Sequence, residues 1–388
     1  MPCARRLPRV WRFRRRLDMT ASSSDEELSE SGRLENFPHP RRVAQLTGHD
    51  AAMAEFAAAL RTGRMHHAWL LSGPQGIGKA TLAFRMARAI LKYGAGSGVA
   101  DDLAMSPDDP VFRKITALSH PDFLLLRRPV DKSGRLQGVL PVEEIRKAAS
   151  FFALSAGEGG WRVCVIDSAD DMNISAANAL LKILEEPPRN AMILLISHAP
   201  GRLLPTIRSR CRKLALRPLG VKALAEVVGA HFPDLSPDDF RLVARLSDGA
   251  PGRALALAHE DGLRIYREMT ELLLSLPAVS APVLHGFAER LARPAAEQNY
   301  ETMTRLLTSW LARMIRDAAA GGIFEDWVAG EAALMRRLMG AATLEQWAVV
   351  WENTVNLLRR ADSVNLGRKQ VILSIFSSLA QTAGGSRG

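Results

Sequence analysis

Residues 73–81 read GPQGIGKAT, and this stretch decides the fold. It has the glycines and the lysine of G-x-x-x-x-G-K-[ST], the pattern of phosphate-binding loops. In such a loop, successive backbone N–H groups and the helix N-terminus behind them hold phosphate oxygens, and the lysine reaches the β- and γ-phosphates. The motif therefore predicts nucleotide contacts from Gly73, Gly76, Gly78 and Lys79.

Position 80 departs from that pattern. The motif has serine or threonine there, whose hydroxyl binds Mg²⁺, whereas this chain has Ala80. Thr81 carries a hydroxyl one residue later, but one helical step turns a side chain by about 100°. We therefore predict that Ala80 and Thr81 belong to the nucleotide site but that Thr81 does not replace the missing magnesium ligand.

Apolar strand patterns alternate with amphipathic helix patterns on both sides of the loop. Strands are expected at 67–72, 122–128, 162–167, 191–197 and 211–216, and helices at 51–64, 80–93, 142–154 and 175–186. This alternation predicts an α/β fold with a parallel, doubly wound sheet. Beyond residue 218 the strand patterns stop, and only amphipathic helix patterns remain.

The composition divides the chain into four segments. Residues 1–36 are basic and then small, polar and acidic, which is typical of a disordered extension. Residues 37–217 hold the alternating pattern of strands and helices. Residues 218–265 predict a small group of helices, and residues 266–388 predict a helical domain of longer amphipathic segments.

The net charge of +10 is concentrated at the N-terminus. Residues 1–18 contain seven arginines and one aspartate, so they supply +6 of that charge. Such a segment fits a targeting peptide or a nucleic-acid-binding arm, and the alternative is that translation starts at Met19. The rest of the chain is only mildly basic, so charge alone does not predict tight binding of nucleic acid.

The composition also argues against several classes of protein. No apolar run approaches the roughly 18 residues that a membrane span needs, so we expect no membrane association. Cys3, Cys164 and Cys211 are too few and too widely spaced for a disulfide framework or a four-cysteine zinc site. A cytoplasmic location is therefore expected, with no reactive role for a thiol.

An aspartate ends the strand expected at 162–167. A carboxylate in that position can hold Mg²⁺ directly or through water, so Asp167 is a candidate for the nucleotide site. The alternative is a turn residue without a ligand. Ser168 follows, and serine is no general base at neutral pH; the loss of a positioned base typically costs about 10²–10⁴ in rate. Asp170 and Asp171 are interpreted as helix-start or surface carboxylates.

Four motifs in order carry a resemblance to a known family. They are HHAWLLSGPQGIGKATLA, VIDSADDMNISAANALLKILEEPP, LLPTIRSRC and DGAPGRAL. Together they resemble the bacterial clamp-loader subunits of the AAA+ class, and within that class the delta-prime family of DNA polymerase III subunits. The matched motifs extend over residues 38–260. LLKILEEPP with SRC is the more specific part, since a glycine loop alone occurs in many families.

The resemblance implies an architecture and a role for one arginine. The architecture is a RecA-like AAA+ P-loop domain with a parallel sheet, a small three-helix lid and an all-helical C-terminal collar domain. Ser209-Arg210-Cys211 matches the family's S-R-C motif, whose arginine reaches into the ATP site of a neighbouring subunit. A guanidinium supplied in this way raises the rate by about 10³–10⁵. The alternative for Arg210 is a solvated surface arginine.

Three further positions match nucleotide contacts of that family. Arg253 matches the arginine that senses nucleotide from the lid. Ser197 and His198 fall where a polar residue at a strand end faces the γ-phosphate. These positions join the loop, Asp167 and Arg210 as the expected site.

Other positions depart from the family. Its members usually carry a four-cysteine zinc module after the helix that follows the loop, but residues 92–120 contain no cysteine, so no zinc is expected. Ala80 and Ser168 remove a magnesium ligand and the carboxylate that activates water. The resemblance therefore implies that ATP is bound rather than hydrolysed, with Mg²⁺ accompanying ATP when it is bound, and that no metal ion is otherwise present.

Three functions compete at this stage. The first is a stator subunit whose partners are the ATPase motor and clamp-opening subunits, the sliding clamp and, through the complex, primed DNA. The second is a competent AAA+ ATPase, either the motor subunit of a loader or a branch-migration helicase, which Ala80 and Ser168 disfavour. The third is a phosphoryl-transfer enzyme such as a small-molecule kinase. The all-helical C-terminal third shows no acceptor site for it.

Overall fold

The computed structural model describes most of the chain beyond residue 36. The described residues are 37–94, 96, 98–130, 136–158, 160–259, 261–364 and 366–385. The expected extension over residues 1–36 lies outside them. Within the described part of the chain, no helix is both long enough and apolar enough to cross a membrane.

The N-terminal part is built on a five-stranded sheet in which every neighbouring pair of strands is parallel. The strands are β1 (Ala68–Ser72), β2 (Phe123–Leu126), β3 (Arg162–Ile166), β4 (Ala191–Ser197) and β5 (Arg212–Ala215). Their order across the sheet is β2-β3-β4-β1-β5. The parallel sheet between helices confirms the predicted α/β class.

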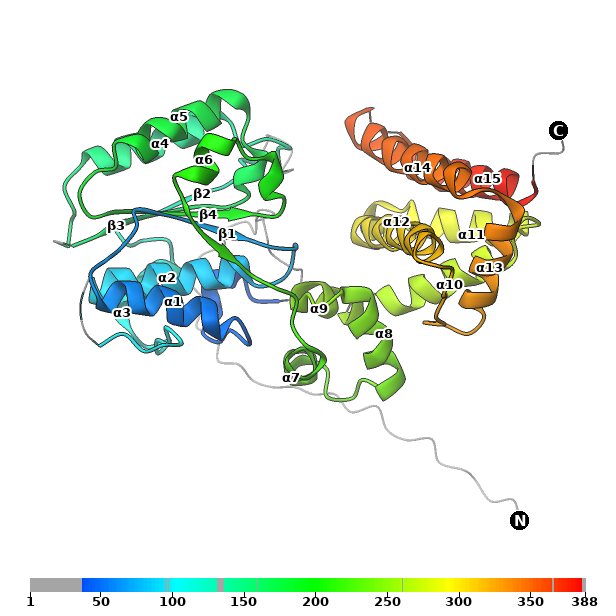
Figure 1. Ribbon diagram of the computed structural model, residues 1–388, viewed down its shortest axis with the longest axis horizontal. Coiled ribbons are helices and arrows are strands. Elements are labelled where there is room, and N and C mark those ends of the chain that lie inside the picture. The colour runs from blue at the N-terminus through cyan, green and yellow to red at the C-terminus, as the bar shows by residue number, and fades with distance from the viewer. Residues whose placement is uncertain are drawn as a thin grey trace, which may run out of the picture.

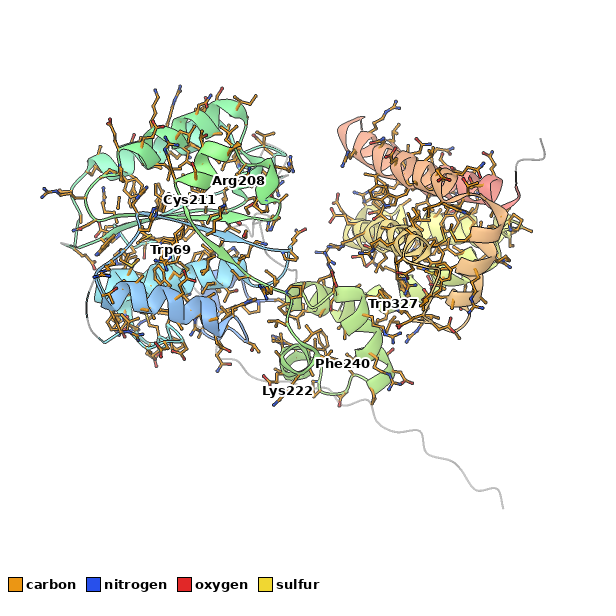
Figure 2. All side chains as sticks on the ribbon, viewed as in Figure 1. Trp69, Arg208, Cys211, Lys222, Phe240 and Trp327 are labelled. Carbon is orange, nitrogen blue, oxygen red and sulfur yellow. The ribbon has the colours of Figure 1, made fainter. Side chains whose placement is uncertain are left out.

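Helices cover both faces of this sheet (Figure 1). One face carries α1 (Asp50–Arg61), α2 (Lys79–Tyr93) and α3 (Pro110–Thr116), and the other carries α4 (Val142–Ala153), α5 (Ile174–Glu185) and α6 (Pro205–Ser209). Figure 2 shows Trp69 on the first side and Cys211 on the second, and each belongs to the apolar core of its side. Because helices cover both faces, every residue of β3 and β4 is buried.

Two elements differ from the sequence-based expectation. The strand expected at 122–128 spans only Phe123–Leu126, because β2 lies at the sheet edge and its pairing with β3 ends opposite Ile166. α3 forms within 94–118, a stretch without a predicted element. Its signal is local, since the carboxylate of Asp109 accepts a hydrogen bond from the first turn and a proline follows directly.

The rest of the described chain is helical. A group of three helices, α7 (Val221–His231), α8 (Pro237–Ser247) and α9 (Pro251–His259), surrounds a small apolar core. A second group contains α10 (Gly262–Leu274), α11 (Ala281–Leu291), α12 (Glu297–Ala319), α13 (Glu331–Ala341), α14 (Leu344–Val364) and α15 (Arg368–Ala383). In Figure 1 the three-helix group lies between the sheet and the second group. The boundary expected at residue 265 falls inside α10, so we propose placing it between α9 and α10.

Two buried arginines on α2 fasten neighbouring segments to the sheet domain. Arg85 donates to the carbonyl oxygens of Ala44 and Asp102, and Arg88 donates to those of Val43 and Arg41. Backbone carbonyls that would otherwise be buried without a partner are thereby satisfied. The chain on both sides of α1–α2 is held by these guanidinium groups.

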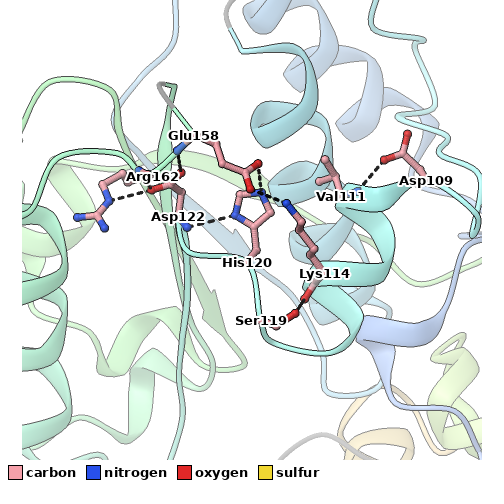
Figure 3. A network of polar contacts seen from close by, with 9 residues as sticks. Asp109, Val111, Lys114, Ser119, His120, Asp122, Glu158 and Arg162 are labelled. Atoms are coloured by element: carbon pink, nitrogen blue, oxygen red, sulfur yellow. Dashed lines mark hydrogen bonds and ion pairs between the residues drawn. The ribbon is translucent and has the colours of Figure 1, made fainter.

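A polar network holds the amino ends of β2 and β3 (Figure 3). Asp122 accepts hydrogen bonds from the backbone N–H of Glu158 at 3.0 Å and from Nε of Arg162 at 3.3 Å. Glu158 in turn pairs with Lys114 of α3 at 2.5 Å, and its other oxygen lies 3.6 Å from Nε2 of His120. The carboxylate of Asp122 therefore links two strand starts to one loop, which is a structural role.

The second helical group contains a buried ion pair. Glu331, at the start of α13, has no exposed side-chain surface and receives Nη2 of Arg313 at 2.8 Å. The same carboxylate accepts hydrogen bonds from the hydroxyl of Tyr266, from Nε1 of Trp310 at 3.0 Å and from the N–H of Trp327 at 3.0 Å. Every one of these donors would lose its partner if the carboxylate were removed.

Glu331→Ala is therefore expected to destabilise the C-terminal helices by about 3–5 kcal/mol, because it leaves a charged guanidinium and an indole N–H buried without partners. Urea unfolding followed by tryptophan fluorescence measures the change. Glu325 offers a matched control, since its side chain is 72% exposed in a long contact with Arg245. Glu325→Ala should change stability by less than about 0.5 kcal/mol. Equal losses of stability from the two substitutions would show that the buried contacts of Glu331 stabilise the helices no more than an exposed glutamate does.

Candidate functional site: the phosphate loop, the strand ends and a distant arginine

The loop between β1 and α2 has the backbone of a phosphate-binding loop. Gly73, Gly76 and Gly78 all have positive φ angles, of 150°, 78° and 106°. A Cβ on Gly73 would lie 2.6 Å from the carbonyl oxygen of Leu216. Glycine is thus required for both conformation and space. The sequence predicted this element, and the loop opens α2 as expected.

Lys79 is turned onto its own loop. Its ammonium group donates to the carbonyl oxygens of Gly73 and Pro74, both at 2.7 Å, and the residue is only 3% exposed. Burial lowers the pKa of Lys79 to about 8, although the charges of Asp170 and Asp167 act in the opposite direction. A nucleotide that takes the lysine as a phosphate ligand has to draw it away from these two carbonyls.

The three-helix group rests directly on the loop. The N–H of Gly252, in the first turn of α9, donates to the carbonyl oxygen of Gly76 at 2.8 Å. A Cβ on Gly76 would lie 3.0 Å from the backbone nitrogen of Arg253, and a Cβ on Gly252 would lie 3.0 Å from the oxygen of Gly76. A Cβ at either position would make a tighter contact than most real Cβ atoms do, so the two glycines favour this close approach of the two backbones.

Asp167 lies at the carboxyl end of β3, as predicted, but among cations. Burial raises its pKa to about 6, and the charges of Arg128, Lys79 and Arg127 oppose that rise. Arg128 also pairs with Asp171 at 3.5 Å. In this site, arginines from the end of β2 balance the carboxylates that a magnesium ion would balance in a competent nucleotide site.

A small hollow lies beside position 80, where the phosphate-loop motif would supply a hydroxyl group. Ala80, Asp167, Arg127 and His39 line it, together with apolar side chains of α2 and the sheet. Ala80, and not Thr81, is the residue of this turn that lines the hollow. That Thr81 does not replace the missing magnesium ligand stays a prediction. The methyl group of Ala80 leaves the carboxylate with cationic neighbours and no hydroxyl from the loop.

The residues that follow Asp167 differ from the sequence-based interpretation. Ser168 is buried and has a left-handed φ of 58°. Asp170, interpreted as a helix-start or surface carboxylate, is instead buried and accepts the backbone N–H of His198 at 3.0 Å. Asp171 is half-buried against Arg128. The helix-start position is confirmed for Asp170, which lies in the first turn of the 3₁₀ helix Ala169–Asp171. The surface position is wrong for it, because its carboxylate is turned toward the end of β4.

Ser197 and His198 end β4 beside this turn. Ser197 is fully buried, and the chain around its hydroxyl offers no hydrogen-bond partner among the described residues. Burial, followed by the charge of Lys79, lowers the pKa of His198 to about 4, so the imidazole is neutral at physiological pH. Their place at the carboxyl edge, near Lys79, agrees with the expected position, while a contact with phosphate stays a prediction.

Arg210 lies at the opposite edge of the sheet. It directly follows α6 and stands two residues before Arg212, which pairs with Trp69 at the start of β1. The phosphate loop begins after the other end of β1, and a strand of four or five residues spans roughly 13–17 Å. The side chain of Arg210 is 37% exposed and pairs with Glu185 at 2.9 Å. Arg210 is therefore separated from the loop of its own chain by the sheet.

The backbone and the side chain of Arg253 contact different parts of the molecule. Its backbone nitrogen lies against Gly76 of the loop, whereas its side chain lines a hollow together with Arg305 and Thr302 of α12. Arg305 is also the charged group that most lowers its pKa after burial. The structure thus places the Arg253 side chain on the side of α9 that meets α12, and a contact with nucleotide stays a prediction.

The two described cysteines are buried packing residues. Burial raises the pKa of Cys164 far above its usual range and that of Cys211 to about 12. Neither thiol is therefore ionised at physiological pH. This agrees with the expectation that Cys211 belongs to its motif without being reactive.

Sequence reasoning did not identify four residues of these sites. Arg127 and Arg128 fell inside an expected strand, although two arginines directly after an apolar run are a signal that the strand has ended. Asp170 carried no signal beyond its proximity to Asp167. Glu185 lies in the quoted LLKILEEPP motif, but its pairing with Arg210 depends on the way α5 and α6 pack.

Gly76→Ala tests the contact between the loop and α9. Gly63 provides the control, because its φ of 67° is also left-handed and a Cβ there meets nothing within 4 Å. Both substitutions carry a backbone cost of about 1–2 kcal/mol. Gly76→Ala should cost about 1 kcal/mol more, because its methyl group presses on the first turn of α9. The measurement is thermal unfolding together with amide exchange at Gly252, which should speed up only in Gly76→Ala. Equal destabilisation and equal exchange would contradict the contact.

Comparison with known proteins places the chain in a family. A family model described as "DNA polymerase III, delta subunit" matches residues 48–220. The DNA polymerase III subunit delta' of Pseudomonas aeruginosa is 36% identical over 226 residues, which are 57% of this chain and 65% of that protein. Its Bacillus subtilis counterpart is 31% identical over 51% of this chain and 55% of that protein. The chain thus spans less than two thirds of these two relatives.

The Escherichia coli DNA polymerase III subunit delta' matches over a longer stretch. It is 30% identical over 264 residues, which are 68% of this chain and 73% of that protein. Among solved structures, a DNA polymerase III gamma subunit-related protein of Thermotoga maritima covers 86% of this chain and 99% of its own, with a TM-score of 0.41 and 16% identity. The RuvB Holliday junction branch migration motor of the same organism covers 73% of this chain and 82% of its own, with a TM-score of 0.38 and 18% identity. The identity and coverage of the Escherichia coli relative, together with the matching family model, show that the chain belongs to the delta-prime family of DNA polymerase III subunits.

Proposed function

We propose that this chain is a stator subunit of a bacterial clamp loader, which supports the ATP-dependent loading of a sliding clamp onto primed DNA. Its direct partners are the ATPase motor and clamp-opening subunits, and it meets the clamp and the DNA through the assembled complex. A cytoplasmic location at the replisome follows from this function. Membership of the delta-prime family supports the proposal.

The observation that carries the proposal is the position of Arg210. The arginine lies at the amino edge of the sheet, across the sheet from the phosphate loop of its own chain. Its guanidinium is partly exposed and held by one carboxylate, Glu185, which is itself half-exposed. An exposed ion pair of this kind is weak, so the arginine can exchange Glu185 for a phosphate of another subunit at little cost.

Arg210 then acts on the ATP site of a neighbouring subunit. A guanidinium stabilises the charge that develops on the transferred phosphoryl group, and its planar fork matches phosphate oxygens better than an ammonium group does. Such an arginine contributes about 10³–10⁵ in rate. Glu185 holds the side chain ready on the surface and takes no part in the reaction.

The chain's own nucleotide site is not built for hydrolysis. Ala80 offers no hydroxyl to a metal, Ser168 offers no base to water, and Asp167 is surrounded by arginines from the end of β2. These features together disfavour the alternative function, an active AAA+ motor subunit or a related helicase. The loop glycines and Lys79 still allow ATP to bind as a structural ligand.

Arg210→Ala in the reconstituted loader, with clamp and primed DNA, should lower ATP turnover at least tenfold while the complex still assembles. Removal of a transition-state contact accounts for a loss of that size or greater. Arg212→Ala is the matched control, because Arg212 lies two residues away, is 42% exposed and pairs with Glu55. Its turnover should stay within about twofold of wild type. Unchanged turnover with Arg210→Ala, or steady hydrolysis by the isolated chain, would sink the stator proposal.

The isolated chain should bind a fluorescent ATP analogue equally well, within about twofold, in Mg²⁺ and in EDTA. The physical reason is that arginines already balance Asp167, so a magnesium ion gains little there. Titrations followed by fluorescence anisotropy measure both affinities. A gain of more than about tenfold with Mg²⁺ (about 1.4 kcal/mol) would show that Asp167 holds the ion. Absence of binding in both buffers would show that Lys79 keeps the loop closed and that ATP is no ligand of this subunit.

A further inference from the structure

A hollow lies in the seam between α9 and α12, outside the nucleotide site. We call it the α9–α12 hollow, and its argument rests on six of its lining residues: Arg253, Leu257, Thr302, Arg305, Leu306 and Ser309. Thr302, Arg305, Leu306 and Ser309 recur at helical spacing on one face of α12. Leu257, Leu306 and Thr302 are buried, whereas Arg253 is half-buried and Arg305 is exposed.

Two guanidinium groups converge on this hollow. Arg305 is exposed on α12 and donates to the hydroxyl oxygen of Thr302 at 3.2 Å. Arg253 is half-buried on α9, and its pKa is lowered first by burial and then by the like charge of Arg305. Asp248, which ends α8, is the carboxylate whose charge acts on Arg253 in the opposite direction. Two guanidinium groups thus line the same hollow, and the charge of Arg305 acts on Arg253.

The lining of the hollow itself has no negative charge. None of its described lining residues is a carboxylate, and none is aromatic. Two like charges held together by packing are relieved by an anion that both can contact. The planar forks of two arginines, joined by hydroxyl groups, match the oxygens of a phosphate group.

We propose that the α9–α12 hollow binds a phosphate group, with Arg253 and Arg305 as its two cationic ligands. Phosphate reaches a protein as a nucleic-acid backbone or as a free nucleotide. The structure favours the backbone, because the lining of the hollow has no aromatic side chain with which to form a stacking pocket for a base. A phosphodiester on a strand needs no such pocket, since only its oxygens enter the seam.

This proposal rests on the proposed function, a subunit of a clamp loader that handles DNA. It adds to that function by naming two residues that would contact the DNA. The bound phosphate would lie between α9, whose first turn rests on the phosphate loop, and α12 of the C-terminal helices. Its failure and that of the stator proposal are distinguishable. The hollow is tested by binding to the full-length isolated chain, whereas Arg210 is tested by turnover in the complex.

The experiment titrates the full chain into a fluorescein-labelled primed duplex at several salt concentrations and follows fluorescence anisotropy. Arg305→Gln should weaken binding at least about fivefold, which is about 1 kcal/mol. It should also reduce the slope of log affinity against log salt by about 1, because one phosphate contact is lost. Arg253→Gln should act in the same direction. Arg305→Lys should retain part of the affinity, because it keeps the charge but loses the fork.

Arg316→Gln is the matched control, because Arg316 is exposed on the same helix, eleven residues beyond Arg305, and is not among the residues that line the hollow. Its affinity should stay within about twofold of wild type. Should Arg253→Gln unfold the lid, Arg305→Gln still decides the matter, since Arg305 lies on the surface. Unfolding curves of each variant verify that the fold is kept.

A parallel titration with ATP and with inorganic pyrophosphate separates the two sources of phosphate. Loss of DNA affinity in Arg305→Gln, with unchanged affinity for ATP and pyrophosphate, supports the backbone phosphate. Loss of affinity for the small anions alone assigns the hollow to a free nucleotide and supports the phosphate site but not the DNA contact. The proposal is overturned if Arg305→Gln changes neither affinity, if Arg316→Gln weakens binding equally, or if the wild-type chain binds none of the three probes.

Discussion

All five strands run parallel, and this single constraint sorts the chemistry of the molecule onto two edges of one sheet. The carboxyl edge receives the phosphate loop after β1, Asp167 after β3 and Ser197 at the end of β4. The amino edge receives Arg210 before β5. Because a parallel sheet never folds one edge onto the other, an arginine at the amino edge cannot serve the phosphate loop of its own chain. The topology therefore separates Arg210 from the phosphate loop of its own chain, which is a condition that the proposed role in trans requires.

The chain's own cations surround the carboxylate of Asp167 beside the phosphate loop. A buried carboxylate needs a cation, and in a competent site magnesium supplies it. Here Arg127 and Arg128 enter from the end of β2, and Lys79 lies beside them. The lysine is occupied with two loop carbonyls.

The contact between Gly76 and Gly252 joins the sheet domain to the three-helix group through backbone atoms alone. It fixes the first turn of α9 on the loop, and the helix then carries the side chain of Arg253 to its other side, toward α12. The first turn of α9 thus contacts the phosphate loop and also borders the hollow that α12 lines. Gly252 and Arg253 are neighbours in the first turn of α9, so the loop contact and the α9–α12 hollow lie at the same end of this helix.

Local sequence patterns determined several features of this protein. They are the glycine loop, the alternation of strands and helices, Asp167 after its strand and the loss of a hydroxyl at Ala80. Each can be identified from the sequence because it depends on residues close together in the chain. The S-R-C motif likewise marked Arg210. Tertiary structure alone decided the rest. Four contacts depend on segments distant in sequence. They join Arg128 to Asp171, Asp170 to the end of β4, Glu185 to Arg210, and Arg253 to Arg305. Such pairings are set by how helices pack on the sheet and on one another, and no local pattern of residues records that packing.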